Sequence, residues 1–224
     1  MRVVVAIDGP AAAGKSTIAK KVAKIKGYTY IDTGAMYRAF TWYCLHKGVD
    51  CQNEAACCAL IPEVKIELKP DNTVLCNGFD VTKAIRQTDV SGNVSYIASY
   101  KAIRLALVDL QRAMAESTSV IMDGRDIGTY VLPNADVKIY QIASVETRAK
   151  RRYKENMEKG IPCTYEEIEE DVKKRDYIDS HRAFAPLKPA EDSILLDTSE
   201  LTIDEVVAKV IEIIDEKLKE RVNG

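Results

Sequence analysis

A glycine-bounded loop at residues 9–16, with the sequence Gly-Pro-Ala-Ala-Ala-Gly-Lys-Ser, narrows the range of folds open to this chain more than any other segment. The loop fits the pattern G-x-x-x-x-G-K-[ST] and follows a continuous apolar run at residues 3–7, which predicts a buried strand. A helical pattern with one apolar face follows over residues 15–26. Because the motif lies between a predicted strand and a predicted helix, it predicts a site for the phosphates of a nucleoside triphosphate.

Phosphate binding requires each residue type in this loop for a different chemical reason. The glycines let backbone N–H groups approach phosphate oxygens without obstruction, and the following helix points its positive end at them. Lys15 can reach the β- and γ-phosphates, and the Ser16 hydroxyl can bind Mg²⁺. We therefore expect ATP to be bound by nine consecutive residues: Gly9, Pro10, Ala11, Ala12, Ala13, Gly14, Lys15, Ser16 and Thr17.

Strand and helix patterns alternate along much of the chain, which is the signature of an α/β fold. Helical patterns cover residues 36–46 and about 89–116, and a capping box at Thr202 and Glu205 opens a terminal helix. Short apolar strands are predicted at residues 3–7, 28–31, 119–122, 137–142 and 193–196. Together these elements predict a three-layer fold, in which helices cover both faces of a central parallel sheet of about five strands.

Two segments depart from this alternation. Residues 64–68, 74–76 and 79–81 read as three short antiparallel strands joined by tight turns, which predicts a small inserted subdomain. Residues 146–179 are strongly charged and are broken only at residues 160–162. They predict two solvated helices joined by a turn.

The composition excludes several classes of protein. Lys and Arg number 32 against 34 Asp and Glu, a net charge of -2, so no overall basic field would hold a nucleic acid. No apolar run approaches the roughly 20 residues that span a bilayer, and the amino-terminal run is too short for a signal peptide. The six cysteines form no C-x-x-C pair, and two histidines are too few for a zinc signature. We expect a cytoplasmic monomer with no nucleic-acid or membrane partner.

The residues after the strand at 119–122 bear on the fate of the γ-phosphate. Asp123 ends this strand and is followed by Gly124 and Arg125. A hydrolytic motor usually has a glutamate directly after this aspartate to activate water, and a guanine-specific switch would need an N-K-x-D segment. Neither feature is present, and the arginine favours transfer of the phosphoryl group to an anionic acceptor over hydrolysis.

Arginines recur at helical spacing in the charged segment. An ion-paired, solvated face is the usual explanation of such spacing, and spacing alone leaves it open beside a role in phosphate binding. Two sets share one helix face each: Arg148, Arg151 and Arg152 at i, i+3 and i+4, and Arg175, Asp179 and Arg182 at i, i+4 and i+7.

Four motifs in a fixed order make the chain similar to a known family. They are residues 9–17, residues 32–38 (Asp-Thr-Gly-Ala-Met-Tyr-Arg), residues 123–129 (Asp-Gly-Arg-Asp-Ile-Gly-Thr) and residues 175–187. On these motifs the chain resembles the bacterial cytidylate kinases, a family of nucleoside monophosphate kinases, over essentially its whole length. Thr33 stands where the family often has serine, and it keeps the hydroxyl.

The resemblance implies an adenylate-kinase-like P-loop fold within a single domain. The core of that domain would comprise about residues 1–34, 100–145 and 186–224. Residues from about 35 to 99 would form an inserted monophosphate-binding subdomain, and residues from about 146 to 185 a mobile lid. A lid of this kind excludes water, which would otherwise accept the phosphoryl group.

The resemblance also implies where CMP would bind. Ser95, Arg104 and Asp126 would read the cytosine edge, whose N4 amino group donates hydrogen bonds and whose N3 and O2 accept them. Arg175 and Asp179 would hold the pentose hydroxyls. The remaining substrate contacts are two residues near the phosphate loop and three arginines that would clamp the CMP phosphate bidentately: Thr33, Asp123, Arg38, Arg125 and Arg182.

The implied reaction is transfer of the ATP γ-phosphoryl group to CMP or dCMP, a step of pyrimidine nucleotide metabolism, with Mg²⁺ as cofactor. The second pKa of a phosphate monoester is about 6, so the acceptor is anionic at neutral pH and needs no general base. Alternatives are a kinase for UMP, AMP or shikimate, and a nucleotide switch without phosphotransfer. The residues expected to neutralise charge beside Mg²⁺, the catalytic set, are Lys15, Arg125, Arg148 and Arg152.

Overall fold

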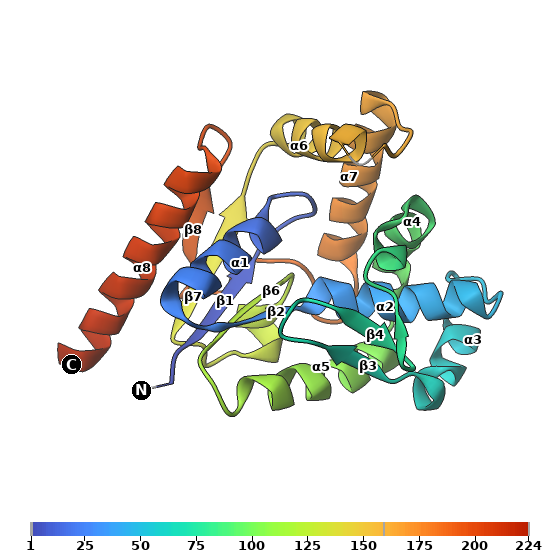
Figure 1. The fold of residues 1–224 in the computed structure, drawn as a ribbon, viewed down its shortest axis with the longest axis horizontal. Helices are drawn as coiled ribbons and strands as arrows, with labels where there is room; N and C mark the ends of the chain where they lie inside the picture. Colours follow the sequence, from blue (N-terminus) through green and yellow to red (C-terminus); the bar gives the residue numbers. More distant parts are fainter. Residues whose placement is uncertain (1, 159, 224) are drawn as a thin grey trace.

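The computed structural model describes residues 2–158 and 160–223. Its central sheet has five strands, all parallel, in the order β2-β6-β1-β7-β8 (Figure 1). Such a sheet, with helices on both faces, confirms the predicted fold class. The strands are β1 (Val4–Asp8), β2 (Thr29–Asp32), β6 (Val120–Gly124), β7 (Val137–Ile142) and β8 (Ile194–Asp197).

The central strand, β1, is apolar on both faces. All five of its residues are buried, and it lies between β6, where Val5 pairs with Ile121, and β7. This placement is what a continuous apolar run predicts. Because all strands are parallel, their carboxyl ends meet at one edge of the sheet. That edge carries four aspartates: Asp8, Asp32, Asp123 and Asp197.

Two helices pack on one face of the sheet, α1 (Lys15–Lys26) and α8 (Ile203–Asn223) (Figure 1). They bury an apolar cluster that includes Val5 and Ile7 of β1. The capping box predicted before α8 is confirmed, since the Thr202 N–H donates to the Glu205 carboxylate at 2.8 Å and its hydroxyl accepts from the Glu205 N–H at 3.3 Å.

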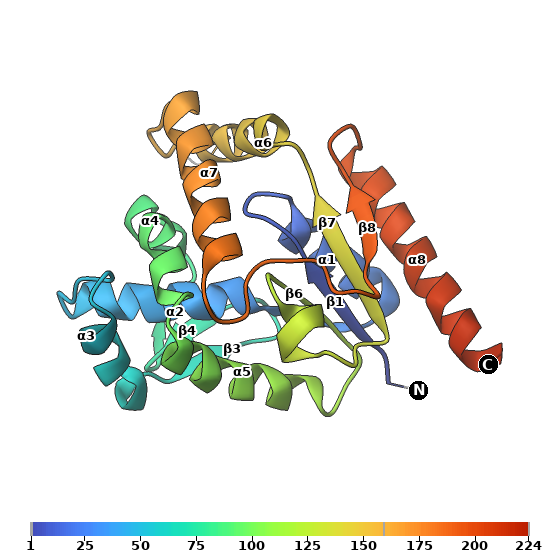
Figure 2. The same ribbon diagram turned by 180° about the vertical axis from the view of Figure 1, so that it is seen from behind.

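The opposite face is covered by α5 (Lys101–Ala115) and by a short π-type helix, η3 (Ile127–Val131) (Figure 2). Val4 and Ala6 pack there, because neighbouring side chains of a strand point to opposite faces. Both faces of the sheet are therefore sealed, and its carboxyl edge is left to form a site.

A second apolar core lies beside the sheet, around Phe40, Ile85 and Ile97. It is built on an antiparallel sheet in the order β3-β4-β5, with α2 and α4 packed against it. The predicted insertion of three short strands is therefore present. Its elements are α2 (Thr33–His46), α3 (Glu54–Ala59), η1 (Ile61–Glu63), β3 (Ile66–Leu68), β4 (Val74–Cys76), β5 (Phe79–Asp80), η2 (Ala84–Arg86) and α4 (Thr88–Ile97).

The charged segment forms the two predicted helices, α6 (Val145–Glu158) and α7 (Tyr165–His181). They pack against each other through a small apolar cluster and stand beside the phosphate loop (Figure 1). A capping box at Thr164 and Glu167 opens α7. No helix of residues 2–158 and 160–223 combines the length and apolar character needed to cross a membrane.

The prediction of one helix over about residues 89–116 is wrong in one respect. The segment forms two helices, α4 and α5, with a short non-helical link between them. The break exposes the Ala98 carbonyl, which accepts hydrogen bonds from Arg104 Nη1 at 3.0 Å and Arg182 Nη1 at 3.4 Å. Two arginine side chains thus replace the helical N–H donors at this point.

Other boundaries differ slightly. Helix α2 begins at Thr33, three residues before its predicted start, because the Asp32 carboxylate caps the Ala35 N–H at 2.8 Å. Strand β6 extends through Asp123 and Gly124, which pair with β1. The helix α3 was not predicted from the sequence.

Candidate active site

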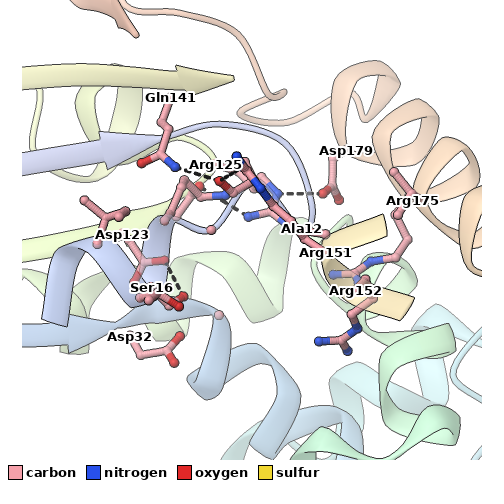
Figure 3. A pocket seen from close by; sticks show the side chains of 18 of the residues that line it. Ala12, Ser16, Asp32, Asp123, Arg125, Gln141, Arg151, Arg152, Arg175 and Asp179 are labelled. Atoms are coloured by element: carbon pink, nitrogen blue, oxygen red, sulfur yellow. Dashed lines mark hydrogen bonds and ion pairs between the residues drawn. The ribbon is translucent and has the colours of Figure 1, made fainter. Parts of the chain in front are cut away.

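A cavity of about 750 Å³ opens at the carboxyl edge of the central sheet. Its walls come from the phosphate loop, from α2, α4 and α5, from the end of β6, and from α6 and α7. Figure 3 shows Arg152 and Arg175 in this space across from Ser16 and Asp123. Of the predicted site residues, all line the cavity except four: Gly9, Pro10, Ala11 and Arg148.

The phosphate loop is held in shape from the neighbouring strand β7. Gly9 has a φ of 150°, and a Cβ there would lie 2.0 Å from the carbonyl oxygen of Gln141, so a side chain cannot be accommodated. The Gln141 side chain donates from Nε2 to the Ala13 carbonyl at 2.6 Å. Gly14, with a φ of 87°, then turns the chain into α1. The loop backbone is thus fixed before any phosphate binds.

Lys15 is buried at the base of the loop. Its Nζ donates to the carbonyls of Gly9 at 2.8 Å and Pro10 at 2.7 Å. Burial, together with the charge of the nearby Arg125 guanidinium, lowers the pKa of Lys15 to about 7. A polyanion in the cavity would favour the charged form of this amine, so binding of phosphates and protonation of Lys15 are coupled.

Ser16 and Asp123 place oxygen atoms side by side at the other edge of the loop. The Ser16 hydroxyl donates to Asp123 Oδ2 at 2.9 Å (Figure 3). The Tyr30 hydroxyl donates to Oδ1 at 2.7 Å. Burial raises the pKa of Asp123 to about 6, with a further contribution from the charge of Asp32. Thr33 supports this corner from behind, because its hydroxyl donates to the Asp123 carbonyl at 2.7 Å.

The predicted base-reading residues meet in the wall formed by α4, α5 and β6. Arg104 Nη2 donates to Asp126 Oδ2, and Arg182 Nη2 lies 3.4 Å from Asp126 Oδ1. Arg104 is 1% exposed and Asp126 is 3% exposed. Ser95 lines the same wall and is buried. Asp126 is thus held between two guanidinium groups in a buried place.

Further arginines converge on the cavity, which acidic side chains also line. Arg38 Nη1 donates to the Ser91 hydroxyl at 2.8 Å, and Arg125 Nε donates to Asp179 Oδ2 at 2.8 Å. Burial, reinforced by neighbouring guanidinium groups, lowers the pKa of both Arg38 and Arg175. The Arg175 Nε has no hydrogen-bond partner among the described residues. Closely spaced, incompletely paired cations are the electrostatic signature of an anion site.

Two lid arginines are placed differently. Arg152 lines the cavity, where its guanidinium lies 3.1 Å from Glu155 and within 3.5 Å of the Ser91 hydroxyl. Arg148 instead lies behind the phosphate loop. Its Nη1 donates to the Ala11 carbonyl at 2.9 Å, and its Nη2 lies 2.7 Å from an Asp176 carboxylate oxygen. In this arrangement Arg148 supports the loop rather than facing the cavity.

Sequence reasoning missed one wall of the cavity. Arg151 lines it and donates from Nη2 to the Thr198 carbonyl at 2.5 Å. Most of the remaining side chains of this wall are apolar, and they come from the segment just before α8 and from the start of α8. The helical spacing put Arg151 beside Arg148 and Arg152, but no local pattern marks the segment that lies opposite. The wall comprises Arg151, Thr198, Leu201, Thr202, Ile203 and Val206.

Asp8 was missed as well. It ends β1 directly before the phosphate loop, and its carboxylate accepts from the N–H groups of Ile127 at 2.8 Å and Gly128 at 2.7 Å. These residues follow Asp126, so Asp8 ties the phosphate loop to the base-reading wall. A polar residue at the end of an apolar strand was the signal available in the sequence.

Solved structures of known proteins share the fold. A gluconokinase from Sinorhizobium meliloti gives a TM-score of 0.53 at 11% sequence identity and covers 100% of this chain and 98% of its own. An uncharacterized protein from Eubacterium ventriosum gives a TM-score of 0.56 at 14% identity, over 96% and 99% of the two chains. At such low identity the similarity concerns the fold alone.

Sequence comparison is more specific. The family model described as Cytidylate kinase matches residues 5–216. A curated relative named Cytidylate kinase from Anoxybacillus flavithermus is 52% identical over 97% of this chain and 98% of its own. Another, from Lactobacillus gasseri, is 55% identical over 96% and 95%, and one from Bacillus subtilis is 50% identical over 95% and 96%. With half of its residues shared over nearly the whole length of these relatives, the chain belongs to the cytidylate kinase family.

Proposed function

We propose that this protein is a cytidylate kinase that transfers the γ-phosphoryl group of ATP to CMP, and also to dCMP, giving ADP and CDP or dCDP. The observation that carries the proposal is the buried ion pair of Arg104 and Asp126 in the wall of the cavity that also holds the phosphate loop. Relatives at 50% identity and above named Cytidylate kinase support the same acceptor.

The Arg104–Asp126 pair suits cytosine by its hydrogen-bonding pattern. The Asp126 carboxylate can accept from the N4 amino group, and the Arg104 guanidinium can donate to N3 and O2. Uracil would turn its O4 acceptor toward the Asp126 carboxylate and its N3–H donor toward Arg104. Sites whose buried polar groups are left unpaired reject near-isosteric substrates by large factors.

The arginines of the cavity suit two phosphate chains in close proximity. We assign the CMP phosphate to Arg38, Arg125 and Arg182, and the transferring phosphoryl group to Lys15 and the lid, with Arg125 and Arg152 beside it. The acceptor oxygen is anionic at neutral pH, so catalysis needs alignment and charge neutralisation but no general base. For Arg148, direct contact with the transferring group would require its bonds to Asp176 and the Ala11 carbonyl to open.

Two further parts of the substrates have a proposed place in the cavity. Arg175 and Asp179 of α7 would hold the pentose of CMP, with Ser95 at the base. The wall of Arg151 and the apolar residues before and within α8 would pack against the flat base of ATP, since such sites combine apolar surface with a few polar groups.

The donor set near the loop fits Mg²⁺. Within the described residues, no group of three or more His, Cys, Asp or Glu side chains could hold a metal ion. Mg²⁺ is usually bound through one or two protein oxygens together with substrate phosphates and water, and Ser16 and Asp123 supply such oxygens. When bound with ATP, the ion would neutralise charge on the β- and γ-phosphates.

The proposed division of the chain is a core (about 1–34, 100–145 and 186–224), a monophosphate-binding subdomain (about 35–99) and a lid (about 146–185). An apolar cluster that the inserted segment forms with one face of α5, and a separate cluster between α6 and α7, support this division. We place the enzyme in the cytoplasm, where thiols stay reduced, and the six free cysteines are compatible with that placement.

The direct test is ADP release from MgATP with CMP, dCMP, UMP, AMP or GMP as the acceptor, each at the same concentration. We expect strong turnover with CMP and dCMP and little with UMP. Lys15→Ala protein purified in parallel controls for contaminating kinases. Comparable turnover with UMP would contradict the assigned base selection, and turnover with none of these nucleotides would contradict the proposed reaction.

A further inference from the structure

Two buried polar side chains behind the base-reading pair have no role in the scheme above. Tyr37 of α2 lines the cavity, and Gln111 of α5 is 0% exposed. Among the described residues, neither the Tyr37 hydroxyl nor the two polar atoms of the Gln111 amide have a hydrogen-bond partner. A phenylalanine and a leucine would avoid the cost of burying these groups unpaired. Since native proteins keep few such groups, their presence here calls for a functional reason.

Tyr37 contacts the base-reading pair through its ring. The Arg104 Cζ lies 5.2 Å from the centroid of the Tyr37 ring, within the range of a cation–π interaction. The Arg104 guanidinium is otherwise held at its two terminal nitrogens, by the Ala98 carbonyl at 3.0 Å and by Asp126. Two bonds in the guanidinium plane fix its direction. A ring face against the guanidinium resists tilting out of that plane, which the two bonds alone do not prevent.

Gln111 is the polar neighbour of the Tyr37 hydroxyl. It stands seven residues after Arg104 on α5, so both side chains project from the same helix face. Its amide is close enough to lower the pKa of Tyr37, which burial raises to about 12. Because burial keeps this pKa high, the hydroxyl is neutral at neutral pH, and an amide that lowers the pKa is one whose N–H can donate to the phenolic oxygen. The two groups make no hydrogen bond to each other in this structure.

We propose that Tyr37 and Gln111 are positioning residues for base selection, in which the Tyr37 ring holds the plane of the Arg104 guanidinium. The Gln111 amide, which makes no hydrogen bond to the Tyr37 hydroxyl in this structure, would bond to it once the nucleotide is bound and so hold the ring. The inference rests on the proposed function, because it concerns how the same site separates CMP from UMP. Hydrogen bonds weaken steeply with misalignment, so a tilted guanidinium would discriminate less between the N3 acceptor of cytosine and the N3–H donor of uracil. The pair would act on the choice of acceptor and leave the donor site unaffected.

The test is the ratio of kcat/KM for CMP to kcat/KM for UMP. We expect Tyr37→Leu, which removes the ring, to lower this ratio about tenfold, the scale of a buried cation–π contact. Tyr37→Phe keeps the ring and loses only the hydroxyl, so the ratio should fall less, by about threefold. The KM for ATP should not change in either variant. Because Tyr37→Phe preserves the packing, it keeps the test valid if Tyr37→Leu does not fold.

A double-mutant cycle tests the role of Gln111. If the amide acts through the Tyr37 hydroxyl, then Gln111→Leu, Tyr37→Phe and the double variant should lower the ratio by the same factor. Effects on the ratio that multiply in the double variant would overturn this part of the inference, because they would show that the two side chains act independently.

Tyr43 provides a matched control on the same helix. Lys47 Nζ lies 5.4 Å from the centroid of the Tyr43 ring, and the Tyr43 hydroxyl donates to Glu63 at 3.0 Å. Tyr43 does not line the cavity. Tyr43→Leu should lower the melting temperature and keep the CMP-to-UMP ratio. If the wild type prefers CMP but Tyr37→Leu loses kcat/KM equally for both nucleotides, the inference is overturned and the proposed function still stands. A wild type without preference for CMP would overturn the proposed function as well.

Discussion

The two sides of the cavity are built in different ways. The phosphate loop of the donor side is one continuous stretch, residues 9–17, of which residues 12–17, including the buried Lys15, line the cavity. The acceptor side consists of charged side chains from α2, α5, the end of β6 and α7, which pair with one another across long distances in the sequence. The phosphate loop lies within one short segment of the sequence, whereas the acceptor side is assembled only when distant segments fold together.

This difference assigns different tasks to the two sides. Backbone N–H groups bind any phosphate chain of the right shape, so the donor side has the means to bind and activate but little means to select. Paired side chains present a fixed pattern of donors and acceptors, so the acceptor side can select. Substitutions on the donor side should therefore lower the rate for every acceptor, and those on the acceptor side should change the preference among acceptors.

The largest expected effect is that of Lys15→Ala. Loss of the charge that we assign to the transferring phosphoryl group should lower kcat about a thousandfold for CMP and for UMP alike. Lys24→Ala, an exposed lysine on the same helix, is the matched control and should keep wild-type kcat. If Lys15→Ala retained near-normal turnover, the assignment of the donor side would be wrong.

Gly9→Ala should disrupt the backbone conformation of the phosphate loop. The new Cβ would meet the Gln141 carbonyl oxygen at 2.0 Å, so the loop must shift and kcat/KM for ATP should fall about a hundredfold. CMP binding without ATP, measured by calorimetry, should stay unchanged. Gly92→Ala in α4, whose Cβ would meet no described atom within 4 Å, is the control and should leave both values as they are. A parallel loss of CMP binding in Gly9→Ala would show that the two sides are not separable.

Asp126→Asn tests the acceptor side. The amide N–H can donate to uracil O4, which the carboxylate cannot do, and the neutral amide oxygen is a weaker acceptor for the N4 amino group of cytosine, so the CMP-to-UMP ratio of kcat/KM should fall about thirtyfold. The measurement is steady-state kinetics with both nucleotides. Asp109→Asn, an exposed residue of α5, should not change the ratio. An unchanged ratio in Asp126→Asn would contradict its role in base selection.

The smallest effect concerns Asp8, which joins the two sides. Burial raises the pKa of Asp8 to about 6, so the folded protein binds this proton more tightly than the unfolded chain. The corresponding stabilisation is full below about pH 4 and is lost as the pH rises through 6. Between pH 5.0 and 7.5 the free energy of unfolding should fall by about 1 kcal/mol more in the wild type than in Asp8→Asn. Urea unfolding of both proteins at the two pH values measures this, and equal pH dependence would contradict the raised pKa.

The donor side could be predicted because its information is local. The apolar run of β1, the spacing of Gly9, Gly14 and Lys15, and the helical period of α1 all lie within the first 26 residues, and each is dictated by backbone geometry or burial. The strands were predicted for the same reason, since each carries a local apolar pattern, which is a continuous buried run in β1.

The acceptor side was predictable only as far as the family resemblance extended, because its pairings are not local. Helical spacing placed Arg148, Arg151 and Arg152 on neighbouring positions but could not show that Arg148 turns to the back of the phosphate loop. The break at Ala98 depends on arginines that approach its carbonyl from α5 and from the end of α7. Neither of these contacts produces a periodic pattern in the sequence.

The central claim, that selection resides in the acceptor side, is tested most directly by calorimetric titration of CMP and UMP into the wild-type protein in the absence of ATP. The assigned hydrogen-bonding pattern predicts that CMP binds and that UMP binds at least about thirtyfold more weakly, even though the donor side is not engaged. Equal affinities for the two nucleotides would contradict the claim, because any preference seen in turnover would then arise after binding.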